Sequence, residues 1–213
     1  MNLFDDKNEW VTKLEPIIQK YKDRKHPLEY KNTYQLMVMV VLSAQDSDAN
    51  VNKISLGLFK IYPNFESLAT ANFIDLIPHI SKVKNYETKG KWLIEMAQTI
   101  KTNKNIPINM NGLVALKGIG RKSANVILRE TKVAPEGIIS DLHVIRVAPR
   151  IGLCLDYKDG NRIEKELMLV FPKSIWGEIG MILSFLGREI CRPTNPNCSE
   201  CLINPVCLYF NSL

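Results

Sequence analysis

Residues 116–124 read Leu116-Lys117-Gly118-Ile119-Gly120-Arg121-Lys122-Ser123-Ala124, and this stretch is the best guide to the fold. Two glycines separated by one apolar residue allow a tight turn between two helices. The N–H groups of such a turn, and of the helix after it, can point at an anion. The pattern is therefore typical of a helix-hairpin-helix, which holds a DNA phosphate without reading sequence. A plain inter-helix turn would carry the same glycines, so the hypothesis needs support from elsewhere.

Apolar residues recur at helical spacing on both sides of this turn. We expect a first helix over residues 10–21 and a buried second one that Thr33 caps and that runs through Leu36, Val40 and Val41. The apolar run in it could also form a strand, but its neighbours are helical. Further helices are expected at 50–61, 66–71, 73–80, 88–103, 111–116, 123–131, 142–152, 161–171 and 175–189. Apart from Asp159-Gly160, which precedes a helical pattern, no Asp-Gly or Asn-Gly suggests a hairpin between strands. The sequence predicts an all-α fold.

The composition is that of an ordinary globular protein. The chain has 213 residues, 46% of them hydrophobic and 23% charged. Its longest apolar run, Leu36 to Leu42, is too short to span a bilayer, and no targeting segment is visible. We therefore expect no membrane contact and a cytoplasmic location. The net charge of +6 is compatible with a polyanionic partner but does not identify one.

Four of the five cysteines lie near the C-terminus, as Cys191-x6-Cys198-x2-Cys201-x5-Cys207. Four thiolates in one short polar loop indicate a metal centre. Disulfides suit small secreted domains and do not fit here. Zinc ribbons usually have two separated Cys-x2-Cys pairs, whereas this loop has one. A [4Fe–4S] cluster accepts four thiolates from a compact loop, although this spacing is not a common ferredoxin pattern. Spacing alone leaves iron–sulfur and zinc open.

Two further residues indicate chemistry. Lys122 lies in the first turn after the glycines, where the helix dipole is expected to lower the pKa of its amine. A neutral amine can attack an electrophilic carbon and form a Schiff base, although a simple phosphate contact is the alternative. Asp141 follows an apolar pair and opens a helical pattern, so it is at least a helix cap. It could also stabilise a cationic transition state or help to activate the lysine.

Taken together, these motifs resemble the endonuclease III family, the bifunctional DNA glycosylases/AP lyases of the helix-hairpin-helix superfamily. The resemblance rests on the 116–124 segment, on Asp141 ahead of His143-Val-x-Arg146-Val147, on the cysteine quartet and on Ser43-Ala44-Gln45. It covers roughly residues 25 to 210. The joint occurrence of these motifs in this order is far more specific than any one of them.

The resemblance implies a two-lobed fold with DNA bound in the cleft between the lobes. One lobe would be a helical bundle, residues 26–135, that ends in the hairpin. The other would combine residues 1–25 with 136–213 and carry a [4Fe–4S] cluster on Cys191, Cys198, Cys201 and Cys207. The cluster would be structural, and its loop would present Arg188 and Arg192 to phosphates.

The resemblance also implies roles for single residues. Lys122 would attack C1′ of the deoxyribose, with Asp141 as its carboxylate partner, and β-elimination would then nick the strand. Gln45 would fill the hole left by a flipped nucleotide, and Asn85 would push into the stack on the opposite strand. The hairpin would bind the backbone through Lys117, Gly118, Gly120, Arg121 and Ser123. His143 would be a residue that fixes local hydrogen bonds, not a catalyst.

Several positions depart from the family pattern. Lys117 replaces a proline at the start of the hairpin, and Leu142 replaces a threonine beside the catalytic carboxylate. Asn85 stands where an apolar wedge is usual, and Pro149 replaces an asparagine. Gln45 is followed by Asp46-Ser47-Asp48, which is unusually acidic beside a DNA backbone. The chemistry is expected to be intact, whereas damage recognition is expected to differ.

The sequence thus favours an enzyme of base excision repair that removes oxidised pyrimidines from duplex DNA, works as a monomer and also acts on abasic sites. A glycosylase for mismatched, deaminated or alkylated bases is the first alternative. A non-catalytic DNA-binding iron–sulfur module is the second, although such a module would not need both Lys122 and Asp141.

Overall fold

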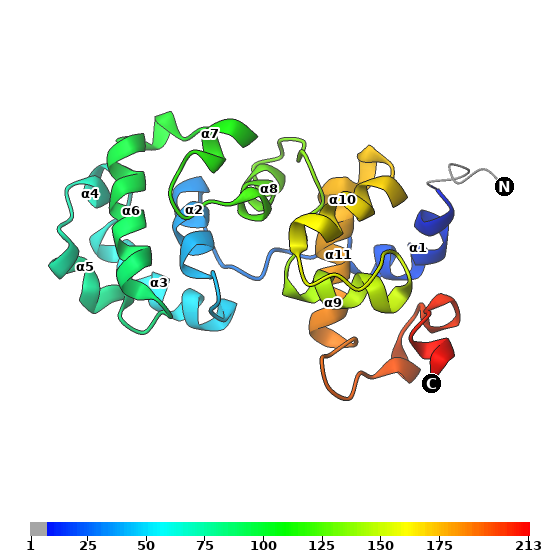
Figure 1. Cartoon of the computed structure of the whole chain (residues 1–213). Coiled ribbons are helices and arrows are strands. Elements are labelled where there is room, and N and C mark those ends of the chain that lie inside the picture. The colour runs from blue at the N-terminus through cyan, green and yellow to red at the C-terminus, as the bar shows by residue number, and fades with distance from the viewer. Residues whose placement is uncertain (1–7) are drawn as a thin grey trace. The chain divides into compact units, whose positions relative to one another are not determined.

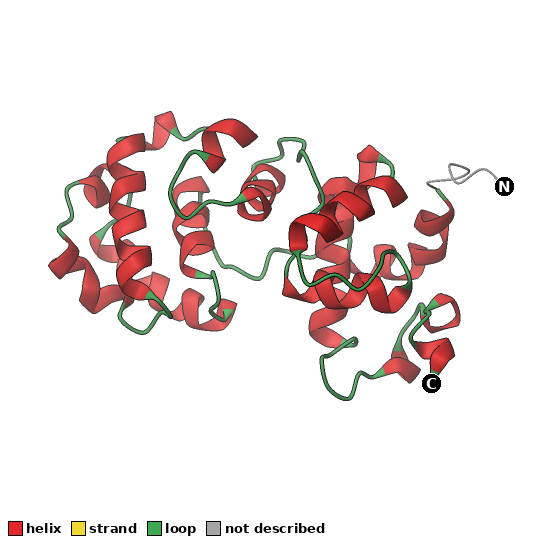
Figure 2. Cartoon of the chain, viewed as in Figure 1, coloured by secondary structure: helices red, strands yellow, loops and turns green. Residues whose placement is uncertain are grey.

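The structure, a computed structural model, describes residues 8–213. Within this range every regular element is a helix, as Figure 2 shows, so the predicted all-α fold is confirmed. The chain divides into two compact units, traced in colour in Figure 1. Lys25–Val133 forms the hairpin unit, and Met1–Arg24 with Ala134–Leu213 forms the cysteine-loop unit. No helix of the described part is long and apolar enough to cross a membrane.

The hairpin unit is built around a helix that is apolar on all sides. This helix, α2 (Thr33–Leu42), buries every residue from Leu36 to Leu42, as expected for a core helix. Its N-cap is Asn32, which accepts a hydrogen bond from the N–H of Gln35, so the prediction that Thr33 is the cap was wrong by one residue. The helices around it are α3 (Asp48–Ile61), α4 (Phe65–Ala69), α5 (Phe73–Ile80), α6 (Tyr86–Ile100), α7 (Met110–Val114) and α8 (Arg121–Glu130).

The glycine turn joins α7 to α8, as a helix-hairpin-helix requires. Gly118 has a φ of +81°, a backbone conformation that favours glycine. A Cβ at this position would meet the Trp92 ring of α6 at 2.9 Å and Val41 of α2 at 3.2 Å. The turn therefore packs closely on two helices of its unit, which fixes where the first turn of α8 lies.

Gly118→Ala is therefore expected to destabilise the protein by about 2–4 kcal/mol, from left-handed strain plus overpacking against Trp92. Gly120→Ala is the matched control, since Gly120 has a φ of −89° and an added Cβ would meet no heavy atom within 4 Å. The free energy of unfolding of Gly120→Ala should fall by no more than about 1 kcal/mol. Urea denaturation of both variants measures the difference, and equal losses would contradict this account of the turn.

The cysteine-loop unit packs two helices against a central one and a further helix on one of these. The central helix is α11 (Trp176–Glu189), and it contacts α1 (Glu9–Tyr21) and α9 (Leu142–Ile151). In turn, α10 (Gly160–Val170) packs on α9. Gly180 of α11 lies so close to the segment before α9 that a Cβ would be 2.4 Å from the carbonyl oxygen of Ile139. This close approach positions the residues that follow Ile139, including Asp141.

Candidate active site

The predicted backbone-binding residues of the hairpin lie together at one turn of the hairpin unit. Lys117, Gly118 and Gly120 form the turn, and Arg121 and Ser123 lie in the first turn of α8. Gly120 is the N-cap and has no side chain to cap α8, and the space that its Cβ would occupy is open. An anion can therefore approach the N–H groups at the start of α8 closely. The exposed side chain of Lys122 lies beside this position.

The hairpin unit presents a second pair of predicted DNA contacts. Gln45 follows the end of α2, and Asn85 precedes α6. Both side chains are exposed, and both residues have a φ of +58°, the left-handed conformation that non-glycine residues adopt rarely. Two strained, exposed residues at neighbouring loop tips are typical of a functional surface.

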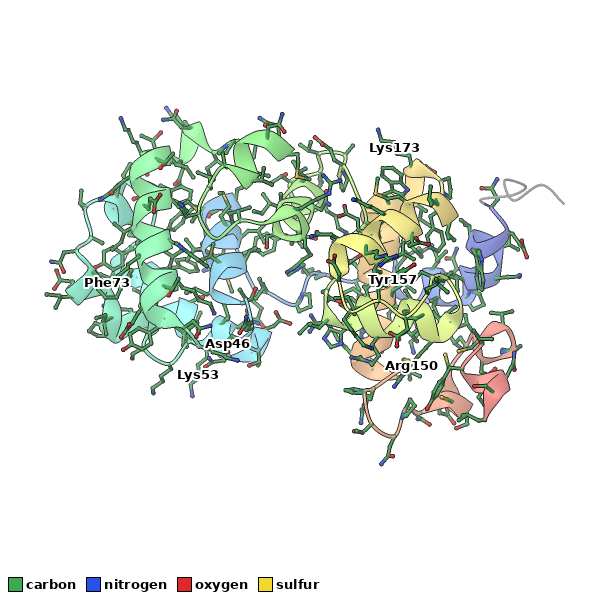
Figure 3. The ribbon with its side chains drawn as sticks, in the orientation of Figure 1. Asp46, Lys53, Phe73, Arg150, Tyr157 and Lys173 are labelled. Atoms are coloured by element: carbon green, nitrogen blue, oxygen red, sulfur yellow. The ribbon has the colours of Figure 1, made fainter. Side chains whose placement is uncertain are left out.

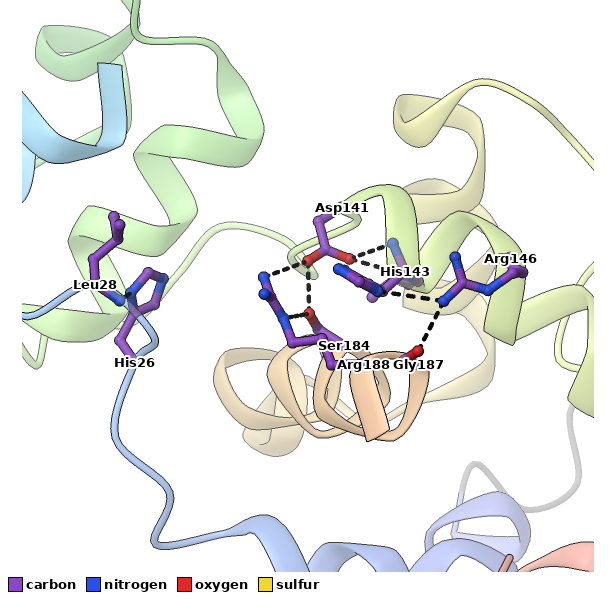
Figure 4. Close-up of polar contacts among 9 residues, drawn as sticks. His26, Leu28, Asp141, His143, Arg146, Ser184, Gly187 and Arg188 are labelled. Atoms are coloured by element: carbon purple, nitrogen blue, oxygen red, sulfur yellow. Dashed lines mark hydrogen bonds and ion pairs between the residues drawn. The ribbon is translucent and has the colours of Figure 1, made fainter. Parts of the chain in front are cut away.

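Asp141 belongs to the cysteine-loop unit and is held on two sides (Figure 4). It is the N-cap of α9, and its Oδ1 accepts the N–H groups of His143 and Val144, each at 2.9 Å. Its Oδ2 accepts the hydroxyl of Ser184 at 2.6 Å, and a guanidinium nitrogen of Arg188 lies 3.8 Å away. The prediction that Asp141 caps a helix is thus confirmed, and its second oxygen is held by α11 as well.

Ser184 is the functional neighbour that sequence reasoning missed. It lies one turn after Gly180 on α11, so the close approach at Gly180 brings it to Asp141. Its hydroxyl donates to Asp141, whereas Leu142, next to Asp141 in sequence, is 75% exposed and has no hydroxyl to offer. Arg188 was expected to face phosphates, but its Nε lies 3.3 Å from the Ser184 hydroxyl and its guanidinium faces Asp141.

His143 fixes local contacts, as its position suggested. Its Nδ1 lies 3.3 Å from a guanidinium nitrogen of Arg146. The same guanidinium donates to the carbonyl oxygens of Gly187 and Cys191, at 2.9 and 3.0 Å. Burial lowers the pKa of Arg146, although a neighbouring Cys191 thiolate would raise it. These contacts join the start of α9 to the end of α11 and the beginning of the cysteine loop.

The four clustered cysteines line one apolar pocket of their unit. Cys191, Cys198, Cys201 and Cys207 surround it with Ile151, Leu186, Ile190 and Ile203, among others, and all four are free thiols. Burial raises the pKa of Cys201, and the other three thiols raise it further, as expected for thiols that face one another. No three His, Cys, Asp or Glu side chains of the described residues converge as single-ion ligands.

Arg150 fastens this loop to α9 (Figure 3). Its guanidinium donates to the carbonyl oxygens of Arg192 and Pro193, at 2.8 and 3.2 Å, and reaches the Cys191 sulfur at 3.5 Å. It also lies over the Tyr209 ring, 4.8 Å from the centroid. Pro149, a departure from the family pattern, is accommodated in the last turn of α9 beside it.

A half-buried histidine of the hairpin unit was not singled out by sequence. The Nδ1 of His26 accepts the N–H of Leu28 at 3.1 Å, which leaves the ring proton on Nε2 (Figure 4). Burial lowers the pKa of His26 from 6.5 to about 4, although Glu130 and Asp48 raise it. His26 is therefore neutral at pH 7.

This pKa predicts a pH dependence of stability. Between pH 6.5 and about 4 the unfolded chain binds a proton at His26 and the folded chain does not. The free energy of unfolding should therefore fall as pH falls through this window. His26→Gln keeps an acceptor for Leu28 and should flatten the decline. Urea denaturation of wild type and of His26→Gln at several pH values measures this decline. If the unfolding free energies of the two proteins ran parallel with pH, the assignment of the decline to His26 would be wrong.

Comparison with known proteins places this chain in one family. The family model of the HhH-GPD superfamily base excision DNA repair protein matches residues 38–173. Endonuclease III of Rickettsia felis is 34% identical over 193 residues, which cover 88% of each chain. Endonuclease III of Bacillus subtilis is 34% identical over 182 residues, which cover 84% of this chain and 83% of the relative.

Solved structures agree with the sequence relatives. A non-covalent endonuclease III–DNA complex superposes with a TM-score of 0.88 at 29% identity, over 97% of each chain. A trapped endonuclease III–DNA covalent intermediate gives the same TM-score and identity, over 97% of this chain and 98% of the other. A thermostable thymine-DNA glycosylase, at 16% identity and a TM-score of 0.78, shares the fold.

Proposed function

Because this chain belongs to the endonuclease III family of HhH-GPD base excision DNA repair proteins, we propose that it removes oxidised pyrimidines from duplex DNA and cleaves the strand at the resulting abasic site. It is a DNA glycosylase and AP lyase of base excision repair. The observation that carries the finer proposal is the pair of intact reactive groups, Lys122 beside the hairpin glycines and Asp141 at the start of α9.

Lys122 is the proposed nucleophile. In its neutral form the amine attacks C1′ of the deoxyribose, the C1′–N bond breaks, and the departing base takes up a proton. Loss of the amine proton and opening of the sugar leave an imine between Lys122 and C1′. Removal of a C2′ proton then expels the 3′ phosphate by β-elimination, which nicks the strand. The hairpin supports this role because its open Gly120 position lets a phosphate lie next to Lys122.

Asp141 is the proposed electrostatic partner. Positive charge develops on the sugar as the base leaves, and a fixed carboxylate stabilises it. The two N–H groups at Oδ1 and the Ser184 hydroxyl at Oδ2 hold this carboxylate in one orientation. A charge that is oriented before the reaction needs no reorganisation during it, so this packing favours an electrostatic role over that of a helix cap alone.

The proposed DNA contacts divide into two kinds. Lys117, Gly118, Gly120, Arg121 and Ser123 would hold the backbone of the damaged strand. Gln45 and Asn85 would enter the base stack when the damaged nucleotide is flipped out. We propose that a monomer suffices and that the protein acts on cytoplasmic, nucleoid DNA. Complexes of related endonuclease III chains with DNA support the choice of partner.

Members of this family are generally [4Fe–4S] proteins, and the cysteine pocket fits such a group. We propose that Cys191, Cys198, Cys201 and Cys207 hold it. Apolar walls, four thiols and the hydrogen bonds of Arg150 to the loop support this proposal. The cluster would serve as a scaffold for the loop and would take no part in the sugar chemistry.

The test is covalent trapping. Purified protein is incubated with borohydride and a duplex that carries one thymine glycol, and in parallel with an abasic duplex. Reduction of the imine should link protein to both duplexes. An adduct with the abasic duplex alone would keep the lyase and move the substrate to another base, such as a mismatched, deaminated or alkylated one. Binding without any adduct would favour a non-catalytic module.

A further inference from the structure

Asp46 is the departure from the family pattern for which the fold gives a clear reason. A carboxylate next to Gln45 would repel a DNA backbone if it faced outward. Instead Asp46, labelled in Figure 3, is half-buried and bonds to the loop before α6. Its Oδ2 accepts the N–H of Lys84 at 2.7 Å, and Lys84 directly precedes Asn85. Its Oδ1 accepts the N–H of Ser47 at 2.8 Å. One carboxylate thus connects the two loop tips.

Asn50 makes a second connection between the same segments. Its side-chain amide donates to Oδ1 of Asp46 at 2.9 Å and to the carbonyl oxygen of Lys82 at 3.0 Å. The start of α3 is therefore bonded to the loop that carries Asn85. Hydrogen bonds to a charged carboxylate are stronger than those between neutral groups, so Asp46 is the main member of this set.

Lys89 makes a third connection, deeper in the unit. Its side chain is 2% exposed, and its Nζ donates to the carbonyl oxygen of Leu42, at the end of α2, at 2.7 Å. Burial lowers the pKa of Lys89, while Asp46 raises it. Partial burial also raises the pKa of Asp46, but its hydrogen bonds and Lys89 outweigh this, so the net pKa lies below its ordinary value. The carboxylate is charged at neutral pH.

We propose that Asp46 is a positioning residue that ties the Gln45 turn to the Asn85 loop, so that both residues enter the base stack as one rigid element. This inference rests on the proposed function of the site. Holding two residues in left-handed conformations requires support from their surroundings, and the Asp46 bonds supply it. Opening a paired lesion costs unstacking energy that an abasic site does not require. Asp46 therefore matters for lesions with a base and little for abasic sites.

The experiment compares Asp46→Ala with wild type in single-turnover reactions on a thymine glycol duplex and on an abasic duplex. We expect base release to slow about tenfold and abasic cleavage to change less than about twofold, because the lost charge-assisted hydrogen bonds position the loops that open the base pair. Asn50→Ala, made alone and with Asp46→Ala, should give a non-additive loss, since the two side chains share one network.

Glu87→Gln is the matched control. Glu87 is an exposed carboxylate two residues after Asn85 whose side chain accepts the Tyr86 hydroxyl, and its replacement removes the same charge near DNA. If Asp46 acted only by repelling phosphates, both substitutions would tighten DNA binding and raise both rates. Such a result, or an equal loss on both duplexes for Asp46→Ala, would overturn the inference.

A readout without DNA separates the two proposals. In wild type the N–H of Lys84 should be protected from hydrogen exchange by Asp46, and Asp46→Ala should remove that protection. If wild type fails to act on thymine glycol, the proposed substrate is wrong. Loss of Lys84 protection in Asp46→Ala would still establish that Asp46 connects the Gln45 turn to the Asn85 loop. Unchanged protection would show that Asp46 does not hold the loop.

Discussion

Replacing Lys122 by glutamine is expected to abolish the borohydride adduct with an abasic duplex and to slow strand cleavage by about 10³-fold or more. An amide nitrogen cannot form the imine on which both results depend. Affinity for an uncleaved duplex should change by no more than about threefold, because at most one phosphate contact is lost. Gel analysis of trapped complexes and a fluorescence titration measure the two quantities.

Lys117→Gln provides the control for this experiment. Lys117 is an exposed lysine of the same hairpin, so its replacement removes the same charge from nearly the same place. This variant should still form the borohydride adduct and should bind DNA more weakly. The slope of log affinity against log salt concentration should fall by about one, as expected for one lost phosphate contact. If the two variants behaved alike, Lys122 would be a phosphate contact, and the Schiff-base mechanism would have to be abandoned.

Asp141→Asn is expected to slow base release by about 10²- to 10³-fold while leaving the fold intact. Asparagine caps helices as well as aspartate does, so its Oδ1 can keep the N–H groups of His143 and Val144. What the variant loses is the negative charge beside the sugar, together with the acceptor for the Ser184 hydroxyl, because an amide nitrogen only donates. Thermal unfolding should therefore change little, while single-turnover release of thymine glycol should fall.

Ser184→Ala tests whether the orientation of the Asp141 carboxylate matters apart from its charge. It keeps the carboxylate of Asp141 and removes only the hydroxyl that donates to Oδ2. Base release should slow by about tenfold or less, as expected for one hydrogen bond to a charged group. A loss as large as that of Asp141→Asn would mean that orientation, and not charge, is what the site requires.

The helices were predictable because local signals specify them, and local signals also led to the proposals for Lys122 and Asp141. Glycines at 118 and 120 indicate a turn, and their φ values and surroundings show why only the first must be glycine. Boundaries were less accurate. The helix expected at 88–103 is Tyr86–Ile100, because Asn85 and Lys101, both with a positive φ, delimit it. Asparagine is a common helix cap, so Asn85 carries a weak signal in sequence, whereas Lys101 carries none.

Contacts between distant segments could not be predicted. Ser184 is a small polar residue in the middle of an apolar helix, and only the close approach at Gly180 brings it to Asp141. Asp46 was noticed as an oddity of charge, but its bond to Lys84 depends on how α2 and α6 pack. Single-residue reasoning identifies which groups are unusual, whereas tertiary packing decides what they contact.

The attachment of the cysteine loop to α9 has a consequence in terms of polymer physics. Arg150 holds the first part of the loop through the carbonyls of Arg192 and Pro193. Its own carbonyl and that of Ile151 accept the N–H groups of Tyr209 and Leu208, just beyond the last cysteine. Most of the entropy lost in closing a loop comes from bringing its ends together. Here α9 already holds the two ends, so the proposed cluster would need to order only the interior of the loop.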